Sequence, residues 1–218
     1  MDKKQLLQGI FTGSLVQVNY SFSQEGEDMI LDNLLKFKRG GFYIDIGAYH
    51  PRQFSNTMRF YQRGWHGLNV DAMPGSMKLF NRLRPRDINV EAGLSSSNEE
   101  MTYYIFKEKA LNTFDESSLE RLRQDGFVPI KKISISSYTI MQILDKYVDK
   151  NQEIDFMDID VEGFDEKVIS QMDFRKYHPN IIMLEKQGME NNSILEDNGY
   201  KLSASTSRTA IYMREALM

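Results

Sequence analysis

The 218-residue sequence contains no cysteine, five prolines, one tryptophan and three histidines. Without cysteine the chain has no disulfide and no thiolate metal site, although this absence excludes no cellular compartment. No run of apolar residues approaches the ~18 that a membrane-spanning helix requires. The first residues, Met1–Gln5, are not followed by the apolar segment of a signal peptide. These absences make a cytoplasmic protein without a membrane span the expectation.

The sequence also lacks a large excess of charge of either sign. Its 27 basic and 31 acidic residues give a formal net charge of −4. Because phosphate contacts need a basic face, this balance argues against a nucleic-acid partner. The one basic-rich stretch, Arg82 to Arg86, is interpreted as the solvated end of a helix, where cations are favourable. The hydrophobic content of 41% and the length predict a single globular domain over residues 1–218.

Short apolar runs alternate with helical patterns along the chain. This alternation predicts an α/β fold with one doubly wound, mostly parallel sheet and helices on both faces. Residues 1–39 are expected to form an N-terminal helical cover, in which Ser23 caps a helix that continues through Phe37. Polar residues 107–132 are predicted to be an insertion between the third and fourth main strands. Strands are expected near 42–46, 67–71, 88–94, 101–106, 133–135, 154–159, 181–185, 200–204 and 210–214.

The most informative segment is the first strand, which places a carboxylate inside an apolar run. Phe42–Ile46 has the pattern of a buried strand, and Asp45 within it needs a partner because an unpaired buried charge is costly. Gly47 follows and lets the backbone turn tightly or approach a ligand closely. At the carboxyl end of a parallel strand the usual partner is a ligand.

A second strand, Gly67–Asp71, also ends in an acid. A strand, a glycine turn, a helix, a strand and a terminal acid form the nucleotide-binding half of a doubly wound fold, in which the second acid binds ribose hydroxyls. The glycines needed beside a pyrophosphate are absent, since the single Gly47 is followed by Ala48–His50. A nucleoside without phosphates, such as S-adenosylmethionine, fits this pattern, and nearby carboxylates would favour its cationic sulfonium.

Further acids lie at the predicted carboxyl ends of strands, the edge at which open parallel sheets bind ligands. One interpretation is that they only cap the helices that follow. Strand alternation places Asp158 and Asp160 on one face, where two like charges need a cation, a proton or a ligand between them, unless one caps a helix and the other is solvated. His50 is either a packed or capping residue or a base in the ligand turn. The acids are Asp45, Asp71, Asp158, Asp160, Glu162 and Glu185.

With these residues the chain resembles the FkbM-type family of S-adenosylmethionine-dependent methyltransferases. The resemblance spans about residues 21–186 and includes Glu185 after an apolar strand. Many members of the family have asparagine where Tyr49-His50 stands, glutamate and proline where Asp71-Ala72 stands, and lysine or serine at position 158. The matching segments are Ser23–Asp28, Tyr43–Ala48 with Phe54–Thr57, Gly67–Asp71, and Asp155–Phe156 with Ile159–Gly163.

The resemblance implies a class I methyltransferase fold, with a seven-stranded sheet that contains one antiparallel strand. It also implies O-methylation of a hydroxyl on a sugar, a glycan or a secondary metabolite. Asp45 and Gly47 would line the methionine and ribose side of S-adenosylmethionine, Asp71 would hold the ribose hydroxyls, and Gln24 would cover the cofactor. The other cofactor-binding residues expected are Ala48, Tyr49, Asn56, Ala72 and Asp158, with Glu91 and Ala92 beside the adenine.

A hydroxyl acceptor must lose its proton, so the site needs a base or a metal that lowers the hydroxyl pKa. His50, Asp160 and Glu162 are the candidate bases. Asp158, Asp160 and Glu185 are candidate oxygen ligands for a divalent cation such as Mg²⁺.

The expected partner is a small-molecule or glycan acceptor, and the sequence does not predict an oligomeric state. Residues 107–132 are expected to border the acceptor pocket, because function concentrates on loops over a rigid sheet. One alternative is a nicotinamide-dependent sugar enzyme, which would need more glycine in the first turn. Another is a non-catalytic binding module on the same fold.

Overall fold

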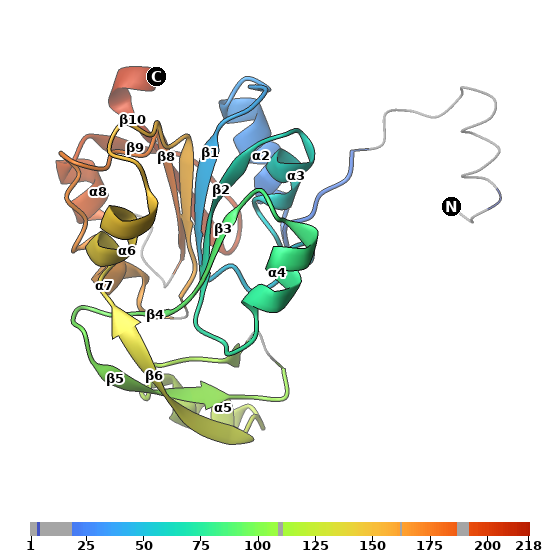
Figure 1. Cartoon of the computed structure of the whole chain (residues 1–218), viewed down its shortest axis with the longest axis vertical. Coiled ribbons are helices and arrows are strands. Elements are labelled where there is room, and N and C mark those ends of the chain that lie inside the picture. Colours follow the sequence, from blue (N-terminus) through green and yellow to red (C-terminus); the bar gives the residue numbers. More distant parts are fainter. Residues whose placement is uncertain (1–3, 5–18, 109–110, 162, 187–191) are drawn as a thin grey trace.

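A seven-stranded sheet forms the centre of the molecule, with helices on both faces (Figure 1). The computed structural model describes residue 4 and residues 19–108, 111–161, 163–186 and 192–218. The strand order is β3-β2-β1-β7-β8-β10-β9, and β10 is the strand that runs against the others. This confirms the predicted mostly parallel sheet with one antiparallel strand. The strands are β1 (Phe42–Ile46), β2 (His66–Asp71), β3 (Ile88–Glu91), β7 (Phe156–Ile159), β8 (Ile181–Glu185), β9 (Tyr200–Ser205) and β10 (Thr209–Arg214).

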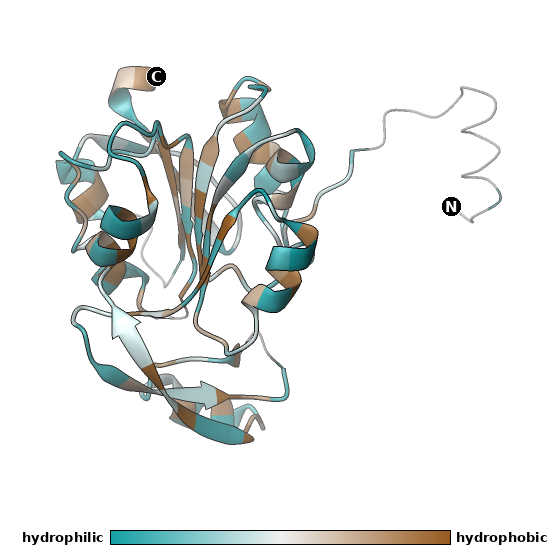
Figure 2. Ribbon diagram, viewed as in Figure 1, coloured by the Kyte–Doolittle hydropathy of each residue, from teal (hydrophilic) through white to brown (hydrophobic). Residues whose placement is uncertain are grey.

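Alternate side chains of the central strands enter two separate cores. Ile44 and Ile46 of β1 pack, with Met157 of β7, in the core beneath α6, α7 and α8. Tyr43 and Phe156 point to the opposite face, where α2 and α3 cover them. Figure 2 shows hydrophobic residues along these strands and hydrophilic residues on the outer sides of the helices. The helices are α2 (Glu27–Leu34), α3 (Met58–Gln62), α4 (Met77–Leu83), α6 (Ile140–Tyr147), α7 (Asp165–Ile169) and α8 (Ser193–Asp197).

A second, three-stranded sheet lies below the main sheet in Figure 1 and has the order β4-β6-β5. The single strand predicted over 88–94 is wrong, because Gly93 and Leu94 leave β3 and find a parallel partner in β6. The short strand predicted at 133–135 is the middle of an eight-residue strand. The elements are β4 (Gly93–Leu94), β5 (Glu100–Ile105), β6 (Lys131–Tyr138) and the helix α5 (Ser118–Gln124).

The helix predicted to start at Ser23 begins at Glu27 instead. Gly26, with φ of 88°, occupies the N-cap position, while the Ser23 hydroxyl accepts a backbone N–H of the first turn at 3.1 Å from outside the helix. The helix ends at Leu34, so Phe37 adopts φ of 56° and is 64% exposed rather than packed. The apolar spacing through Phe37 therefore overstated the length of the helix.

The N-terminal cover predicted over residues 1–39 is described only in part. Leu31 of α2 is fully buried against the sheet, whereas residues 1–3 and 5–18 lie outside the described residues. Within the ranges that the structure describes, every helix is too short or too polar to cross a membrane.

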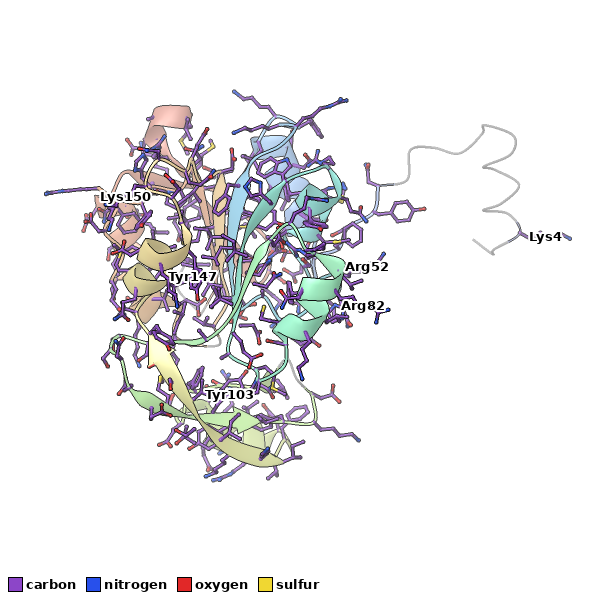
Figure 3. All side chains as sticks on the ribbon, viewed as in Figure 1. Lys4, Arg52, Arg82, Tyr103, Tyr147 and Lys150 are labelled. Carbon is purple, nitrogen blue, oxygen red and sulfur yellow. The ribbon has the colours of Figure 1, made fainter. Side chains whose placement is uncertain are left out.

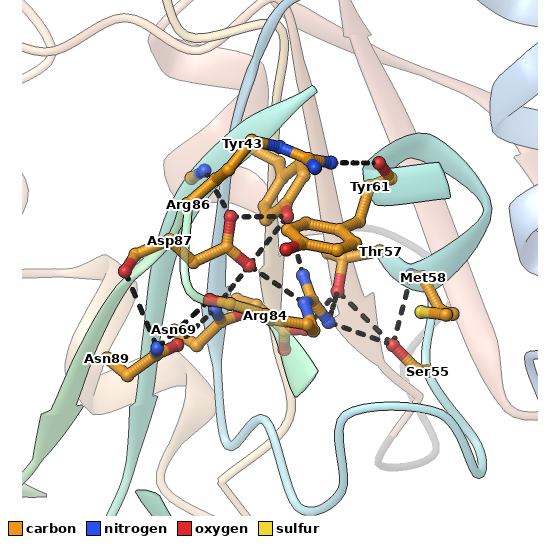
Figure 4. A network of polar contacts seen from close by, with 12 residues as sticks. Tyr43, Ser55, Thr57, Met58, Tyr61, Asn69, Arg84, Arg86, Asp87 and Asn89 are labelled. Atoms are coloured by element: carbon orange, nitrogen blue, oxygen red, sulfur yellow. Dashed lines mark hydrogen bonds and ion pairs between the residues drawn. The ribbon is translucent and has the colours of Figure 1, made fainter. Parts of the chain in front are cut away.

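Arg84 is fully buried, so the solvated helix end predicted for Arg82 to Arg86 is wrong at this residue. Figure 4 shows its guanidinium, which donates to Asp87 at 2.8 Å, to the Tyr43 hydroxyl at 2.6 Å and to the Thr57 hydroxyl at 2.9 Å. The rings of Tyr43 and Tyr61 lie 5.2 Å from the guanidinium carbon, within cation–π range. A basic run marks a helix end but does not reveal such partners from β1 and α3.

Asp87, the residue before β3, compensates the buried charge of Arg84 and is bonded to both β1 and β2. Its carboxylate accepts hydrogen bonds from the Tyr43 hydroxyl at 2.8 Å, the Gly67 N–H at 3.0 Å and the Asn69 amide at 2.9 Å. An ion pair in the interior is tolerated only when its remaining donors and acceptors are satisfied in this way.

Replacing Asp87 by Asn tests this network. The substitution keeps the size of the side chain but leaves Arg84 as an uncompensated buried cation, so the free energy of unfolding should fall by about 3–5 kcal/mol. Urea unfolding followed by circular dichroism measures the change. Asp125→Asn, at an exposed position, is the matched control and should leave the midpoint unchanged. Equal stability of Asp87→Asn and Asp125→Asn would show that the Arg84–Asp87 ion pair does not stabilise the fold.

Candidate active site

A cavity of about 120 Å³ lies where β1, β2 and β7 end, against the second sheet, and we call it the sheet-edge cavity. Ten of the predicted cofactor-binding residues line it. Glu91 is the exception, since its carboxylate accepts the Gly75 N–H at 2.7 Å instead. The ten are Gln24, Asp45, Gly47, Ala48, Tyr49, Asn56, Asp71, Ala72, Ala92 and Asp158.

Position 47 requires a glycine because another segment of the backbone lies directly against it. The φ of Gly47 is 88°, and a Cβ added there would lie 1.7 Å from the carbonyl oxygen of Asp160. The N–H groups of Gly47 and Ala48 both donate to the Val70 carbonyl, at 2.9 and 3.0 Å. The close approach predicted at this turn is therefore to the loop after β7, which brings Asp160 beside the end of β1.

Asp45 is buried on the same face of β1 as Tyr43. It accepts a hydrogen bond from the Thr57 hydroxyl at 2.7 Å. Arg84 donates to the same Thr57 oxygen at 2.9 Å (Figure 4). The Thr57 hydroxyl proton is therefore directed toward Asp45. Burial raises the pKa of Asp45 to about 6, and the charge of Arg84 acts against that rise. The carboxyl therefore titrates nearer to neutral pH than an ordinary aspartate does.

Asp158 lies directly across from Asp45, because β1 and β7 pair in parallel with these two residues in register. The Asn56 amide donates to its carboxylate at 2.7 Å. Burial, followed by the charge of Asp45, raises the pKa of Asp158 well above its usual value. Two buried carboxyls on neighbouring strands favour a positively charged ligand, because a cation offsets both the burial and the repulsion.

Asp71 ends β2 with both carboxylate oxygens oriented. One accepts the Tyr49 N–H at 3.1 Å and the other accepts the Met73 N–H at 2.8 Å. Tyr49 reaches this position through φ of 47°, which is uncommon for a residue other than glycine. Burial is the main cause that raises the pKa of Asp71. An oriented carboxylate at this point suits the binding of a pair of hydroxyls.

A larger cavity of about 870 Å³ adjoins the first, and we call it the outer cavity. Gln24, Thr113 and Asp160 line both cavities. The other walls come from residues 111–122, from α7 and from the region where β8 ends near Arg208. A ligand that extends from one cavity into the other therefore passes Asp160.

The structure separates the three candidate bases. Asp160 lies at the junction of the two cavities. His50 does not line either cavity in the described part of the chain, and its Nδ1 accepts the N–H groups of Arg52 and Gln53 at 3.2 and 3.0 Å. This is the capping role that the sequence left open. Glu162 lies outside the described residues.

The candidate metal ligands are likewise divided. Asp158 faces the sheet-edge cavity, whereas Glu185 lines the outer cavity and lies 3.4 Å from Arg208. Among the residues that the structure describes, no group of three or more histidine, aspartate or glutamate side chains is arranged to hold a metal ion. The predicted convergence of Asp158, Asp160 and Glu185 on one cation is therefore not found there, because Asp158 and Glu185 line different cavities.

The sequence did not predict the wall of the sheet-edge cavity that the second sheet and the insertion form. Tyr103 of β5, together with Asn112 and Phe114 of the insertion, lines it. The predicted insertion thus contributes to both cavities. Its only sequence signal is a polar stretch with little periodicity, which indicates a loop but does not show which residues turn inward.

Comparisons with known proteins agree with this architecture. The crystal structure of Methyltransferase FkbM from Methylobacillus flagellatus KT is similar, with a TM-score of 0.52 and 12% identity over 88% of this chain and 48% of that one. This chain therefore spans about half the length of that protein, and at this identity the likeness concerns the fold. A search among curated proteins finds no match.

Two other crystal structures match with lower TM-scores. A TehB-like SAM-dependent methyltransferase from Corynebacterium glutamicum has a TM-score of 0.41 and 12% identity, over 97% of this chain and 95% of that one. An O-methyltransferase from Bacillus cereus has the same TM-score and identity, over 97% and 90%.

The sequence itself carries the family assignment. Residues 45–202 match the model of the Methyltransferase FkbM domain, which covers more than half of the chain. The matched range begins at Asp45 and contains Asp71, Asp158 and Asp160, so it includes the four carboxylates that line the sheet-edge cavity. The chain therefore belongs to the FkbM family of S-adenosylmethionine-dependent methyltransferases.

Proposed function

We propose that this protein transfers the methyl group of S-adenosylmethionine to a hydroxyl group of a small molecule or glycan. The observation that carries the proposal is the meeting of the two cavities at Asp160. The sheet-edge cavity has the carboxylates that suit the cofactor, and the outer cavity has the volume of a small-molecule site, which is typically about 300–1,000 Å³.

The residues of the sheet-edge cavity fit S-adenosylmethionine. Asp45 and Asp158 are buried, register-matched carboxyls that favour a cation, and the methionine end of the cofactor carries a sulfonium and an ammonium. Asp71 would hold the ribose hydroxyls, because backbone N–H groups orient its oxygens. Ala92, beside the end of β2, would flank the adenine, as the family resemblance implies.

The bound cofactor supplies an electrophilic methyl group. In the transfer, a new bond joins the acceptor oxygen to the methyl carbon while the bond from that carbon to sulfur breaks, and the hydroxyl proton must leave. The protein mainly aligns the reacting groups and removes the proton. Asp160 is the proposed base, because it lies at the point that both ligands reach.

His50 is a weaker choice as the base. Accepting a proton at Nδ1 would break the two bonds from Arg52 and Gln53 that this nitrogen accepts. Glu162 stays a prediction from the sequence. No observation favours the nicotinamide alternative, since Gly47 is the only glycine of the first turn and the family match is to methyltransferases.

Asp71→Ala tests the ribose contact. Because the substitution leaves the ribose hydroxyls without their acceptor, the binding of S-adenosylmethionine should weaken by about 1–3 kcal/mol. Isothermal titration calorimetry on the purified protein measures this difference. Asp125→Ala, at an exposed site on α5's C-terminal side, is the control. Unchanged affinity in Asp71→Ala would place the ribose contact elsewhere.

The pH dependence of cofactor binding tests the role of Asp45. Its pKa is raised to about 6, so the carboxyl becomes protonated and loses its attraction for a cation as the pH falls through that value. We expect the affinity for S-adenosylmethionine to decrease between about pH 8 and about pH 5, by linkage of proton and cation binding. Asp45→Asn should bind weakly at about pH 8 and depend less on pH. An Asp45→Asn profile that superimposes on the original would contradict this role.

Asp160→Asn tests the base. It keeps the size of the side chain but removes its proton-accepting charge, so methyl transfer should slow by ~10²-fold or more while cofactor affinity is retained. The measurement is incorporation of labelled methyl into an acceptor identified from a panel of hydroxylated compounds. Adding a chelator to the unaltered enzyme separates a protein base from a metal. Normal turnover in Asp160→Asn would contradict the assignment of Asp160 as the base. Tight cofactor binding without transfer to any hydroxyl compound would favour the non-catalytic binding module.

A further inference from the structure

The outer cavity is rich in basic side chains, although the chain as a whole carries a net charge of −4. The four cations reach it from four separate segments of the fold. Arg121 comes from α5, Lys167 from α7, Lys186 from the end of β8, and Arg208 from the turn between β9 and β10. Solvated lysines and arginines ordinarily spread over a convex surface, whereas these surround one hollow.

Most of the cations have no acid in direct contact within the described part of the chain, although the charge of Lys167 acts on Glu99 at longer range. Arg208 pairs with Glu185 at 3.4 Å, but no ion pair within 4.0 Å joins Arg121, Lys167 or Lys186 to a described acid. Lys186 donates to the Thr206 carbonyl at 2.8 Å, which leaves two of its N–H groups. The Lys167 ammonium lies 4.2 Å from the centre of the Phe164 ring, which holds it at the cavity wall.

The acids that line the outer cavity have other roles. Besides Glu185, which faces Arg208, Asp115 accepts hydrogen bonds from the hydroxyls of Ser117 and Ser118. Asp160 lies at the junction with the sheet-edge cavity, where the proposed function places the acceptor hydroxyl. The described lining therefore has four cations against the three acids Asp115, Asp160 and Glu185, which is an excess of one positive charge.

The lining is also polar apart from the charges. Leu111 and Leu122 are its only large apolar side chains among the described residues, while Ser117, Ser118 and Thr113 add hydroxyls. Such a wall suits a hydroxylated ligand, because an apolar ligand would leave these groups without hydrogen bonds. The volume of about 870 Å³ accommodates a sugar together with a charged substituent.

We infer that the acceptor is an anionic, hydroxylated molecule, such as a sugar with a phosphate or carboxylate group, whose charge is bound by Arg121, Lys167 and Lys186. This inference rests on the proposed methyl transfer and names its substrate class. The anionic group would lie among the cations while a hydroxyl of the same molecule faces Asp160. Charge-assisted hydrogen bonds to lysine and arginine would give both affinity and orientation. Neutral sugars and apolar metabolites would lack that anchor.

Binding of matched probes tests the inference. The protein, saturated with S-adenosylhomocysteine, is titrated with glucose 6-phosphate, with glucuronate and with glucose, which share a ring and differ in charge. At least one anionic probe should bind about tenfold or more tightly than glucose, and added salt should reduce the difference. Comparing glucose 6-phosphate with glucuronate shows whether the cavity prefers a phosphate or a carboxylate.

The double variant Arg121→Gln/Lys167→Gln tests the residues. It should lose about tenfold or more in affinity for the preferred anionic probe, with little change for glucose. The matched control is Arg82→Gln/Lys150→Gln, whose side chains point away from the molecule in Figure 3 and line neither cavity. The control should keep the preference. A cofactor-induced rise in melting temperature shows that each variant is folded.

The outcomes separate the inference from the proposed function. Tight binding of S-adenosylmethionine with no preference for anionic probes over glucose, or with no probe bound at all, would overturn the anionic acceptor and leave methyl transfer standing. A preference that survives in the double variant would overturn the assignment to these cations. A protein that binds no S-adenosylmethionine would overturn the proposed function, and the inference with it.

Discussion

The buried guanidinium of Arg84 is the interaction on which the rest of the structure depends. A charge in the interior must be compensated, and here Asp87 supplies the opposite charge while Tyr43 and Thr57 accept the remaining hydrogen bonds. Thr57 in turn donates to Asp45, so the compensation of one buried cation reaches a carboxylate of the sheet-edge cavity. The packing of α3 and α4 against β1 and the electrostatics of the cavity are consequently parts of one network.

This network explains how a sheet edge becomes a site for a cation. Asp45 and Asp158 face each other across two parallel strands, and burial raises the pKa of both. The positive charge of Arg84 partly offsets that rise for Asp45. A sulfonium or ammonium group would complete the balance of charge. Asp45 and Asp158 cost stability without a cationic partner, and they therefore favour binding of the cofactor of the family.

Local sequence signals predicted the parts of the structure whose causes are local. The apolar run of β8 and the sequence from Asp45 to Gly47 indicated a strand and its turn, and the structure has both. The burial of Arg84 was not predictable, because its partners come from β1, α3 and the start of β3, which only the fold brings together. His50 remained open until its contacts with Arg52 and Gln53 were known. The inward-facing residues of the insertion could not be predicted either, because only the fold determines which of them line the cavities.

The two cavities divide the work of the proposed reaction, with cofactor recognition on the main sheet and acceptor recognition on segments that surround its edge. The most direct test of this account is a crystal structure of the protein with S-adenosylhomocysteine. In that structure the ribose should lie at Asp71, the methionine end between Asp45 and Asp158, and the sulfur should point toward Asp160 and the outer cavity. A nucleoside bound elsewhere, or a sulfur directed away from Asp160, would contradict it.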